Sequence, residues 1–109
     1  MTTLSEQEFR LACDDALARA EQALLPLADR EGFEVGMQDG VLELLFDEPT
    51  PTKFVVSPNG PARQVWVSAM AKGYKLSWVP EARTFALNGE ALPDLLARLI
   101  AEFLRGRTA

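Results

Sequence analysis

The stretch RQVWVSAMAKGYKLSW, residues 63–78, decides how this chain folds. Its first half alternates, so Val65 and Val67 share one side of a strand while Trp66 points to the other side, beside Gln64. Its second half reads as a return strand after a polar turn. Strands joined by so short a turn must run antiparallel. The segment therefore predicts a hairpin with one aliphatic side and one polar side that carries a tryptophan.

Alternation with a period of two recurs on both sides of this hairpin. Four further strands are predicted, at residues 33–38, 41–47, 53–57 and 83–87. Asp39-Gly40 is typical of a two-residue hairpin turn, and the prolines at positions 58 and 61 indicate a tight turn between the third and fourth strands. The middle of the chain is therefore a series of about six short strands.

A helix is predicted before the first strand. Ser5 is placed as its N-cap and Glu8 completes a capping box. Apolar residues at three- and four-residue spacing form its buried stripe: Phe9, Cys13, Ala16, Leu17, Ala20, Leu24 and Leu27. Pro26 is expected to kink or end the helix near Leu25, and Gly32 closes the segment.

A second helix is predicted after the last strand. Pro93 suits its first turn and Gly106 fits just past its end. Its stripe consists of Leu92, Leu95, Leu96, Leu99, Ile100 and Phe103. Two helices with one apolar stripe each must cover one face of the sheet and leave the other to solvent. The expected fold is an α+β, two-layer sandwich, with residues 1–109 forming a single domain.

Composition narrows the function. No apolar run approaches the roughly 20 residues that span a bilayer, and the N-terminus has no targeting character, so a cytoplasmic protein is expected. The chain has one cysteine and no histidine. Zinc sites of the usual Cys/His kind, Ser/His/Asp triads and Cys/His nucleophiles are thereby excluded. Cys13 lies on the helical stripe, so a buried core thiol is expected.

Charge is distributed unevenly along the chain. Residues 1–48 carry twelve acids against three arginines, whereas residues 49–109 carry four acids against eight bases. An acidic first half disfavours nucleic acid and anionic membranes and favours cations or a basic protein partner. A solvated face that only aids solubility is the alternative. Two roles also remain open for Trp66. Its side chain either rests on neighbouring strand residues or anchors a protein partner.

Several stretches resemble one known family, the frataxins, most closely the bacterial CyaY type. The most specific is NGPARQVWVS at residues 59–68, which is similar to the family's strand signature of Pro, two variable residues, Gln, an aliphatic residue and Trp. GYKLSW, EFRLA, DGVLELLF and NGEALPDLL agree in kind and position. The resemblance covers nearly the whole chain, and its helix, meander, helix order agrees with the order predicted above.

The resemblance implies a role in iron-sulfur cluster assembly, as a regulator of cysteine desulfurase or an iron donor. Frataxins bind iron (Fe2+ or Fe3+) weakly through an acidic ridge on the first helix and first strand. The matching or neighbouring acids here are Asp14, Glu21, Asp29, Glu31, Glu34 and Asp47. Carboxylates are hard oxygen ligands that suit such ions. The ridge is thinned, because Leu25 to Ala28 and Gly36 occupy places where relatives carry acids.

The implied partners are the cysteine desulfurase and the scaffold protein. The acids would meet a basic patch on the desulfurase, and the open sheet face would meet the scaffold assembly. The implied partner-binding residues are Asn59, Gln64 and Trp66, with Arg63 beside them. No nucleic acid or membrane partner is expected, and a monomer is expected, with iron-dependent oligomers left open.

Three functions remain at this stage. The first is a non-enzymatic, iron-binding regulator of cluster assembly. The second is a protein-interaction module that kept the fold and lost the metal, which the thinned ridge favours. The third, a ferroxidase, is disfavoured because the chain lacks the Glu-x-x-His motifs of di-iron centres.

Overall fold

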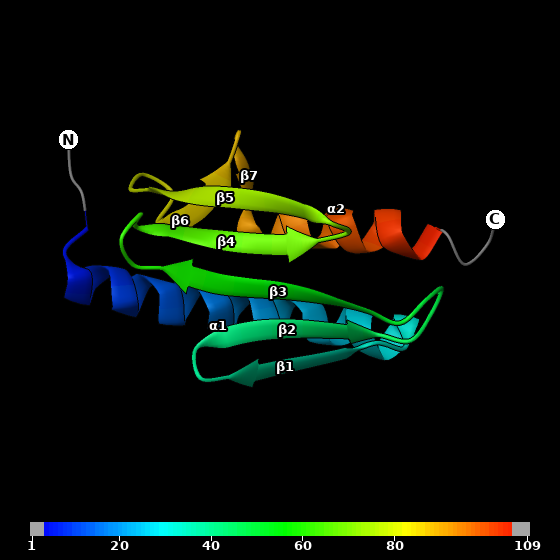
Figure 1. The fold of residues 1–109 in the computed structure, drawn as a ribbon. Helices are drawn as coiled ribbons and strands as arrows, with labels where there is room; N and C mark the ends of the chain where they lie inside the picture. The colour runs from blue at the N-terminus through cyan, green and yellow to red at the C-terminus, as the bar shows by residue number, and fades with distance from the viewer. Residues whose placement is uncertain (1–3, 106–109) are drawn as a thin grey trace.

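The computed structural model describes residues 4–105 and shows two helices on one face of an antiparallel sheet (Figure 1). The elements in chain order are α1 (Glu6–Glu31), β1 (Glu34–Gln38), β2 (Val41–Phe46), β3 (Thr52–Asn59), β4 (Gln64–Ala69), β5 (Lys72–Val79), β6 (Thr84–Leu87), β7 (Glu90–Ala91) and α2 (Leu92–Leu104). The strands lie in the sheet in the order in which they occur in the chain, and every neighbouring pair is antiparallel. The predicted α+β sandwich is confirmed, with one more strand than expected.

The extra strand is β7, a two-residue pairing that leads directly into α2. Its sequence is too short to show any alternation, so only the pairing of Leu87 with Glu90 across the Asn88-Gly89 turn reveals it. Pro93 lies in the first turn of α2, as predicted. The expectation for Gly106 falls outside the described residues.

Helix α1 begins as predicted and ends later than the proline suggested. The Ser5 and Glu8 capping box is present, with hydrogen bonds of 2.8 and 3.1 Å, and Gly32 closes the helix in the left-handed conformation. The expectation that the helix ends near Leu25 is wrong, because α1 continues through Pro26 to Glu31. The buried side chains of Leu24 and Ala28 hold the turns on either side of the proline against the sheet, and this packing outweighs the lost backbone hydrogen bond.

Two turns differ from the sequence-based expectation. The β4–β5 turn is formed by Met70 and Ala71, both at positive φ, and is therefore not polar. Met70 packs partly against the core, which explains an apolar residue at this place. Strand β3 runs on through Pro58 to Asn59, so the turn begins only at position 60, because a proline fits an extended strand and removes a single donor. The Asp39-Gly40 turn is confirmed, with both residues at positive φ.

The hydrophobic core lies between the sheet and the two helices. Phe54 in β3 is fully buried, and its ring lies 4.9 Å from that of Phe46 and 5.7 Å from that of Phe103. Phe46 also contacts Phe33 and Phe103, so this aromatic cluster joins β2, β3 and α2. Cys13 is buried in the same core, as predicted, and burial raises the pKa of its thiol to about 12.

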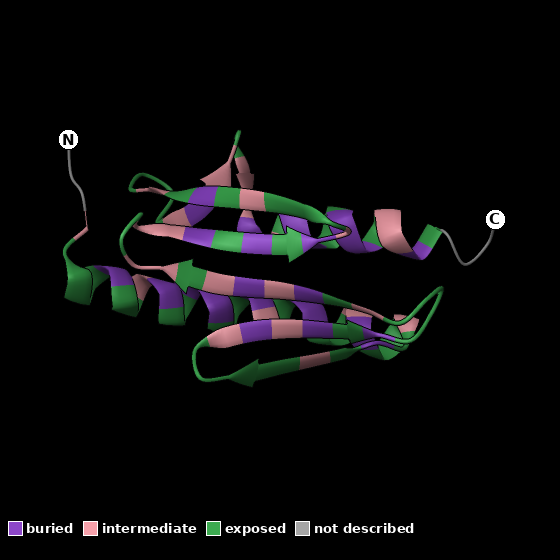
Figure 2. Cartoon of the chain, viewed as in Figure 1, coloured by how far each residue is buried: buried purple, intermediate pink, exposed green. Residues whose placement is uncertain are grey.

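The two faces of the sheet differ as the opening hairpin predicted. Val65 and Val67 are buried under the helices, whereas Trp66 on the opposite face is 36% exposed. Figure 2 shows this alternation of buried and exposed residues along β4. Trp78 is half-buried and packs edge-on against Phe85. Neither helix in the described part of the chain is long and apolar enough to cross a membrane.

Candidate interaction and metal-binding surface

Two of the predicted acids lie along one flank of α1. Asp14 and Glu21 are seven residues apart, which is nearly two full turns, so they lie on the same line of the helix. Asp14 is exposed and Glu21 half-buried. The opposite flank of α1 packs toward α2, where Leu27 and Ile100 line a shared hollow. The side of α1 that carries Asp14 and Glu21 therefore faces the β1–β2 hairpin.

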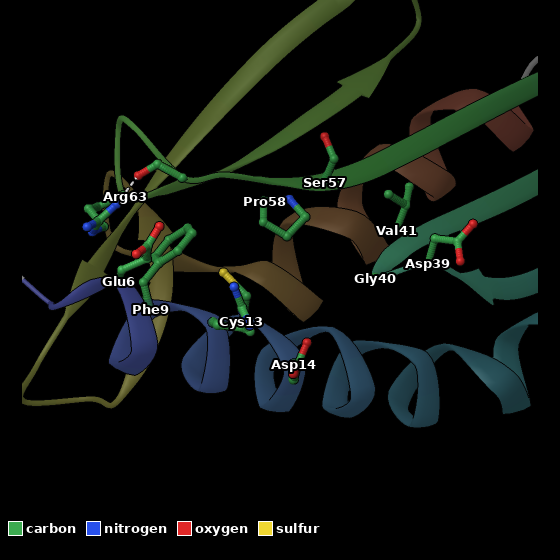
Figure 3. Close-up of a pocket in the computed structure, with 12 residues that line it drawn as sticks. Glu6, Phe9, Cys13, Asp14, Asp39, Gly40, Val41, Ser57, Pro58 and Arg63 are labelled. Atoms are coloured by element: carbon green, nitrogen blue, oxygen red, sulfur yellow. Dashed lines mark hydrogen bonds between the residues drawn. The ribbon is translucent and has the colours of Figure 1, made fainter.

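Asp14 lines a hollow where the first turns of α1 meet two hairpin turns (Figure 3). The hollow has a volume of about 540 Å³. Asp39 from the β1–β2 turn and Glu6 from α1 add two further carboxylates. Arg10 and Arg63 line the same hollow and offset much of this negative charge. This end of the surface is thus mixed in charge, and less suited to a cation than the count of acids suggests.

Arg63 is held in place by the N-terminal end of α1 and its own turn. Its guanidinium donates to the backbone carbonyl oxygens of Leu4, at 3.1 Å, and of Gly60, and it lies over the Phe9 ring at 5.8 Å. Figure 3 shows the side chain directed into the hollow beside Phe9. In this conformation its hydrogen-bonding groups serve to join the β3–β4 turn to α1. Its expected contribution to partner binding stays a prediction.

A second group of predicted acids gathers at the other end of α1. Glu34 and Asp47 line a hollow of about 520 Å³ together with Lys53. Glu31, Asp47 and Glu48 line an adjoining hollow of about 340 Å³. Both hollows contain Gly32 and Phe46, so they are neighbours at the point where the chain passes from α1 into β1. Glu48 is an acid that the sequence did not single out, because it lies in a loop and outside any alternating pattern.

The six predicted metal ligands therefore do not form one site. Asp14 and Glu31 are 17 residues apart on one helix, a separation of about 25 Å along its axis. Glu21 lies between the two ends, and Asp29 is exposed near the end of α1 without lining either hollow. Within residues 4–105, no three acidic or cysteine side chains are arranged so that they could hold one metal ion.

Ion pairs remove part of the negative charge from this surface. Arg19 contacts Asp15 at 2.8 Å, Arg30 contacts Glu31 at 3.2 Å, and Lys53 contacts Glu43 at 3.7 Å. These pairs are solvent-exposed and contribute little to stability. The predicted acids that take part in no hydrogen bond or ion pair in the described chain are Asp14, Glu21, Asp29, Glu34 and Asp47. These five carboxylates are the ones free to meet a cation or a basic partner.

The open face of the sheet brings the predicted partner-binding residues together around Trp66. The indole Nε1 donates to Gln64 Oε1 at 3.0 Å, and the Gln64 amide donates to Ser77 at 3.3 Å. Asn59 pairs with Gln64 across the strands, and its own Oδ1 accepts from the Ala62 amide at 2.9 Å. Asn59, Gln64 and Trp66 therefore form one polar cluster with the indole presented to solvent.

Lys75 also belongs to this cluster, although the sequence analysis did not predict it. Its Nζ lies 4.9 Å from the centre of the Trp66 ring, and the two residues are directly paired in the sheet. A cation over an aromatic ring is attracted to it. The signal was present, because a two-residue turn at Met70 and Ala71 places position 75 opposite position 66. The polar residues around this turn do not show which two positions form it, so the pairing of Lys75 with Trp66 does not follow from the sequence alone.

Comparison with known proteins identifies the family to which this chain is similar. A protein-family model described as a frataxin-like domain matches residues 2–106. The chain is 29% identical to the iron-sulfur cluster assembly protein CyaY of Ralstonia nicotianae, over 94% of this chain and 90% of that protein. It is 32% identical to the protein of the same name from Dechloromonas aromatica, over 69% of each chain. The similarity thus spans both helices and the whole sheet.

Proposed function

The chain belongs to the frataxin-like family, and on that premise we propose that it acts in iron-sulfur cluster assembly as a non-enzymatic, cytoplasmic regulator or iron donor. The observation that carries the proposal is the family match over residues 2–106, with relatives named for that process. Its partners in this proposal are a cysteine desulfurase and the scaffold protein. The chemistry of two surfaces supports the choice.

The first surface is the acidic flank, by which we mean Asp14, Glu21, Glu34 and Asp47. These carboxylates have no ion-pair partner in residues 4–105, so a basic patch on the desulfurase can pair with them without displacing an internal contact. Such contacts set orientation and association rate, and they weaken as salt is added. The flank is the proposed desulfurase surface.

The second surface is the cluster around Trp66. A tryptophan held by a hydrogen bond to Gln64 and covered on one side by Lys75 is already ordered before a partner arrives. An ordered aromatic residue loses little conformational entropy on binding, which favours its use as an anchor. This cluster is the proposed scaffold surface.

Exchanging the charge of the flank should weaken the desulfurase complex. We expect the double variant Glu21→Lys and Glu34→Lys to bind a purified cysteine desulfurase at least about tenfold more weakly at low salt, because two attractive contacts become repulsive. Titration calorimetry at two salt concentrations measures the affinity and its salt dependence. The wild-type affinity should fall with salt and that of the variant should change much less.

Glu81→Lys with Asp94→Lys is the matched control. Both positions are exposed and lie far along the chain from the flank, so the net charge changes equally while desulfurase affinity should stay within about twofold of wild type. If both double variants weakened desulfurase binding equally, the loss of affinity would come from the change in net charge and not from the acidic flank. A wild-type protein that forms no complex at low salt would remove the proposed function.

The metal-free interaction module is the second candidate, and one observation favours it. No three described carboxylates converge on a single point, so a closed metal site is not available. The donor chemistry still fits a hard cation, because the free carboxylates are exposed oxygen ligands. Iron, as cargo, would be held at diffuse positions shared by two acids or fewer. The chain has no histidine that could serve as an iron ligand in a ferroxidase centre. Catalytic oxygen consumption with ferrous iron would support the ferroxidase alternative.

A titration with ferrous iron separates these candidates. If iron binds, we expect amide resonances of residues 14–34 and of Asp47 to broaden or shift at millimolar iron, with Glu34→Gln reducing the change at the end near Gly32. The measurement is a ¹⁵N correlation spectrum under anaerobic conditions, with magnesium as the control ion. A spectrum that is unchanged by iron would favour the metal-free module, while desulfurase binding tests the rest of the proposal.

A further inference from the structure

Strand β1 forms one edge of the sheet and leaves backbone groups without a partner. The register with β2 pairs Gln38 with Val41 across a two-residue turn, so Gln38, Gly36 and Glu34 direct their N–H and C=O groups toward β2. The groups of Val35 and Met37 therefore point away from the sheet. No hydrogen bond in the described chain engages either of them.

Nothing in residues 4–105 covers this edge. Figure 1 shows β1 at the border of the sheet, with α1 lying behind the sheet and not beside the strand. Four of the five residues of β1 are exposed, as Figure 2 shows by colour. Native edge strands are usually guarded by a lysine, a proline or a bulge. The sequence EVGMQ contains neither lysine nor proline, and its pairing with β2 is unbroken.

Side chains beside the edge offer two different surfaces to an added strand. On the helix side, Met37 and Leu25 are each 38% exposed, and Val35 is half-buried. Leu25 follows Glu21 by one helical turn, so it lies on the flank of α1 that faces the hairpin. On the open side, Gly36 leaves room between Glu34 and Gln38, since a Cβ built there would meet nothing within 4 Å.

The charges around the edge select the partner. Glu34 lies on β1 itself, with Glu21 on the neighbouring helix flank and Asp39 at the turn, and none of them is engaged in an ion pair within residues 4–105. A second copy of this chain would bring the same carboxylates against each other. A basic segment would instead find opposite charge on the open side and apolar contact on the helix side.

We propose that the outer edge of β1 accepts an extended basic segment of a partner protein as an eighth strand, with basic and apolar residues alternating along it. Backbone hydrogen bonds to Val35 and Met37 supply the pairing, and Glu34 on the open side supplies the preference for basic residues. The inference rests on the proposed function, since it describes how a basic partner docks on the same side of the molecule.

The test uses the whole chain and a defined probe, an acetylated and amidated nine-residue peptide of alternating lysine and valine. Hydrogen exchange by NMR reads the amides of Val35 and Met37 directly. Both should exchange at least about tenfold more slowly with the peptide bound. A peptide of the same sequence, N-methylated at every second residue, should give no protection.

Proline substitution at the edge removes a donor without touching the β1–β2 pairing. Met37→Pro should weaken peptide binding about tenfold, because its missing N–H points outward, where an edge strand tolerates proline. Met37→Ala keeps the N–H and should lose less. Val35→Pro repeats the test at the other outward position, and amide spectra of β2 establish that each variant keeps its sheet.

The outcomes separate this inference from the proposed function. Equal binding of the N-methylated peptide, or protection only around Trp66, would overturn strand addition. Unchanged peptide binding in Met37→Pro and Val35→Pro, with the sheet intact in both variants, would also overturn it, although the proposed function would stand. Peptide protection at Val35 and Met37 by a protein that binds no desulfurase would support the edge as a docking site and refute the proposed function.

Discussion

Replacing Pro26 with alanine should raise the free energy of unfolding by about 3 kcal/mol, because proline inside a helix costs about that much relative to alanine. The substitution restores the amide that α1 lacks and allows a hydrogen bond to the Gln22 carbonyl. Pro26 is exposed, so little packing is lost. Urea unfolding followed by circular dichroism measures the change, and the melting temperature should rise by about 10 °C.

Pro93→Ala is the matched control for this prediction. Pro93 lies in the first turn of α2, where a missing N–H has no intrahelical partner to lose, so its removal should change stability by less than about 1 kcal/mol. A Pro26→Ala variant that is no more stable than wild type would mean that the α1 backbone around position 26 does not form the expected bond. The backbone of α1 would then keep the bend that the proline imposes even after the proline is removed.

Truncating Phe54 to alanine should destabilise the protein by about 4 kcal/mol. The side chain is fully buried and its ring contacts both Phe46 on β2 and Phe103 on α2, so the truncation leaves a cavity where the sheet meets α2. A domain of this size has only about 5–15 kcal/mol in total. We expect a large drop in the urea midpoint and partial unfolding near 37 °C.

Two control variants test whether the loss of stability comes from the aromatic cluster. Phe54→Leu keeps most of the volume and should cost clearly less than the alanine substitution. Leu11→Ala removes a side chain that is 62% exposed and should change stability by no more than about 0.5 kcal/mol. Similar losses for Phe54→Ala and Leu11→Ala would contradict the assignment of Phe54 to the centre of the core.

Most of the fold could be predicted because local signals and the global arrangement agree. The Ser5 cap, the Asp39-Gly40 turn and the alternation around Trp66 each use interactions between residues close in sequence. The predictions failed where packing overrode a local preference. Pro26 remained inside a helix held by its buried neighbours, and Met70 occupied a turn because it also reaches the core.

The candidate site was less predictable for a geometric reason. The family resemblance singled out Asp14 and Glu21, and both lie on α1, on the same line of the helix. The sequence could not show that Arg10 and Arg63 line the same hollow as Asp14, since that arrangement depends on how two hairpin ends meet the helix. Nor could it show that Glu31 and Asp47 line one hollow, since β1 and β2 separate these residues along the chain.

Helices α1 and α2 lie side by side on the sheet, although within residues 4–105 one is the first element and the other the last (Figure 1). During synthesis, the strands emerge and can pair in sequence before α2 is available to cover its part of the apolar face of the sheet. The exposed region would include Phe54, whose ring packs against Phe103 of α2, until α2 leaves the ribosome. The nascent chain is therefore most dependent on chaperones in the interval between the emergence of β6 and the emergence of α2.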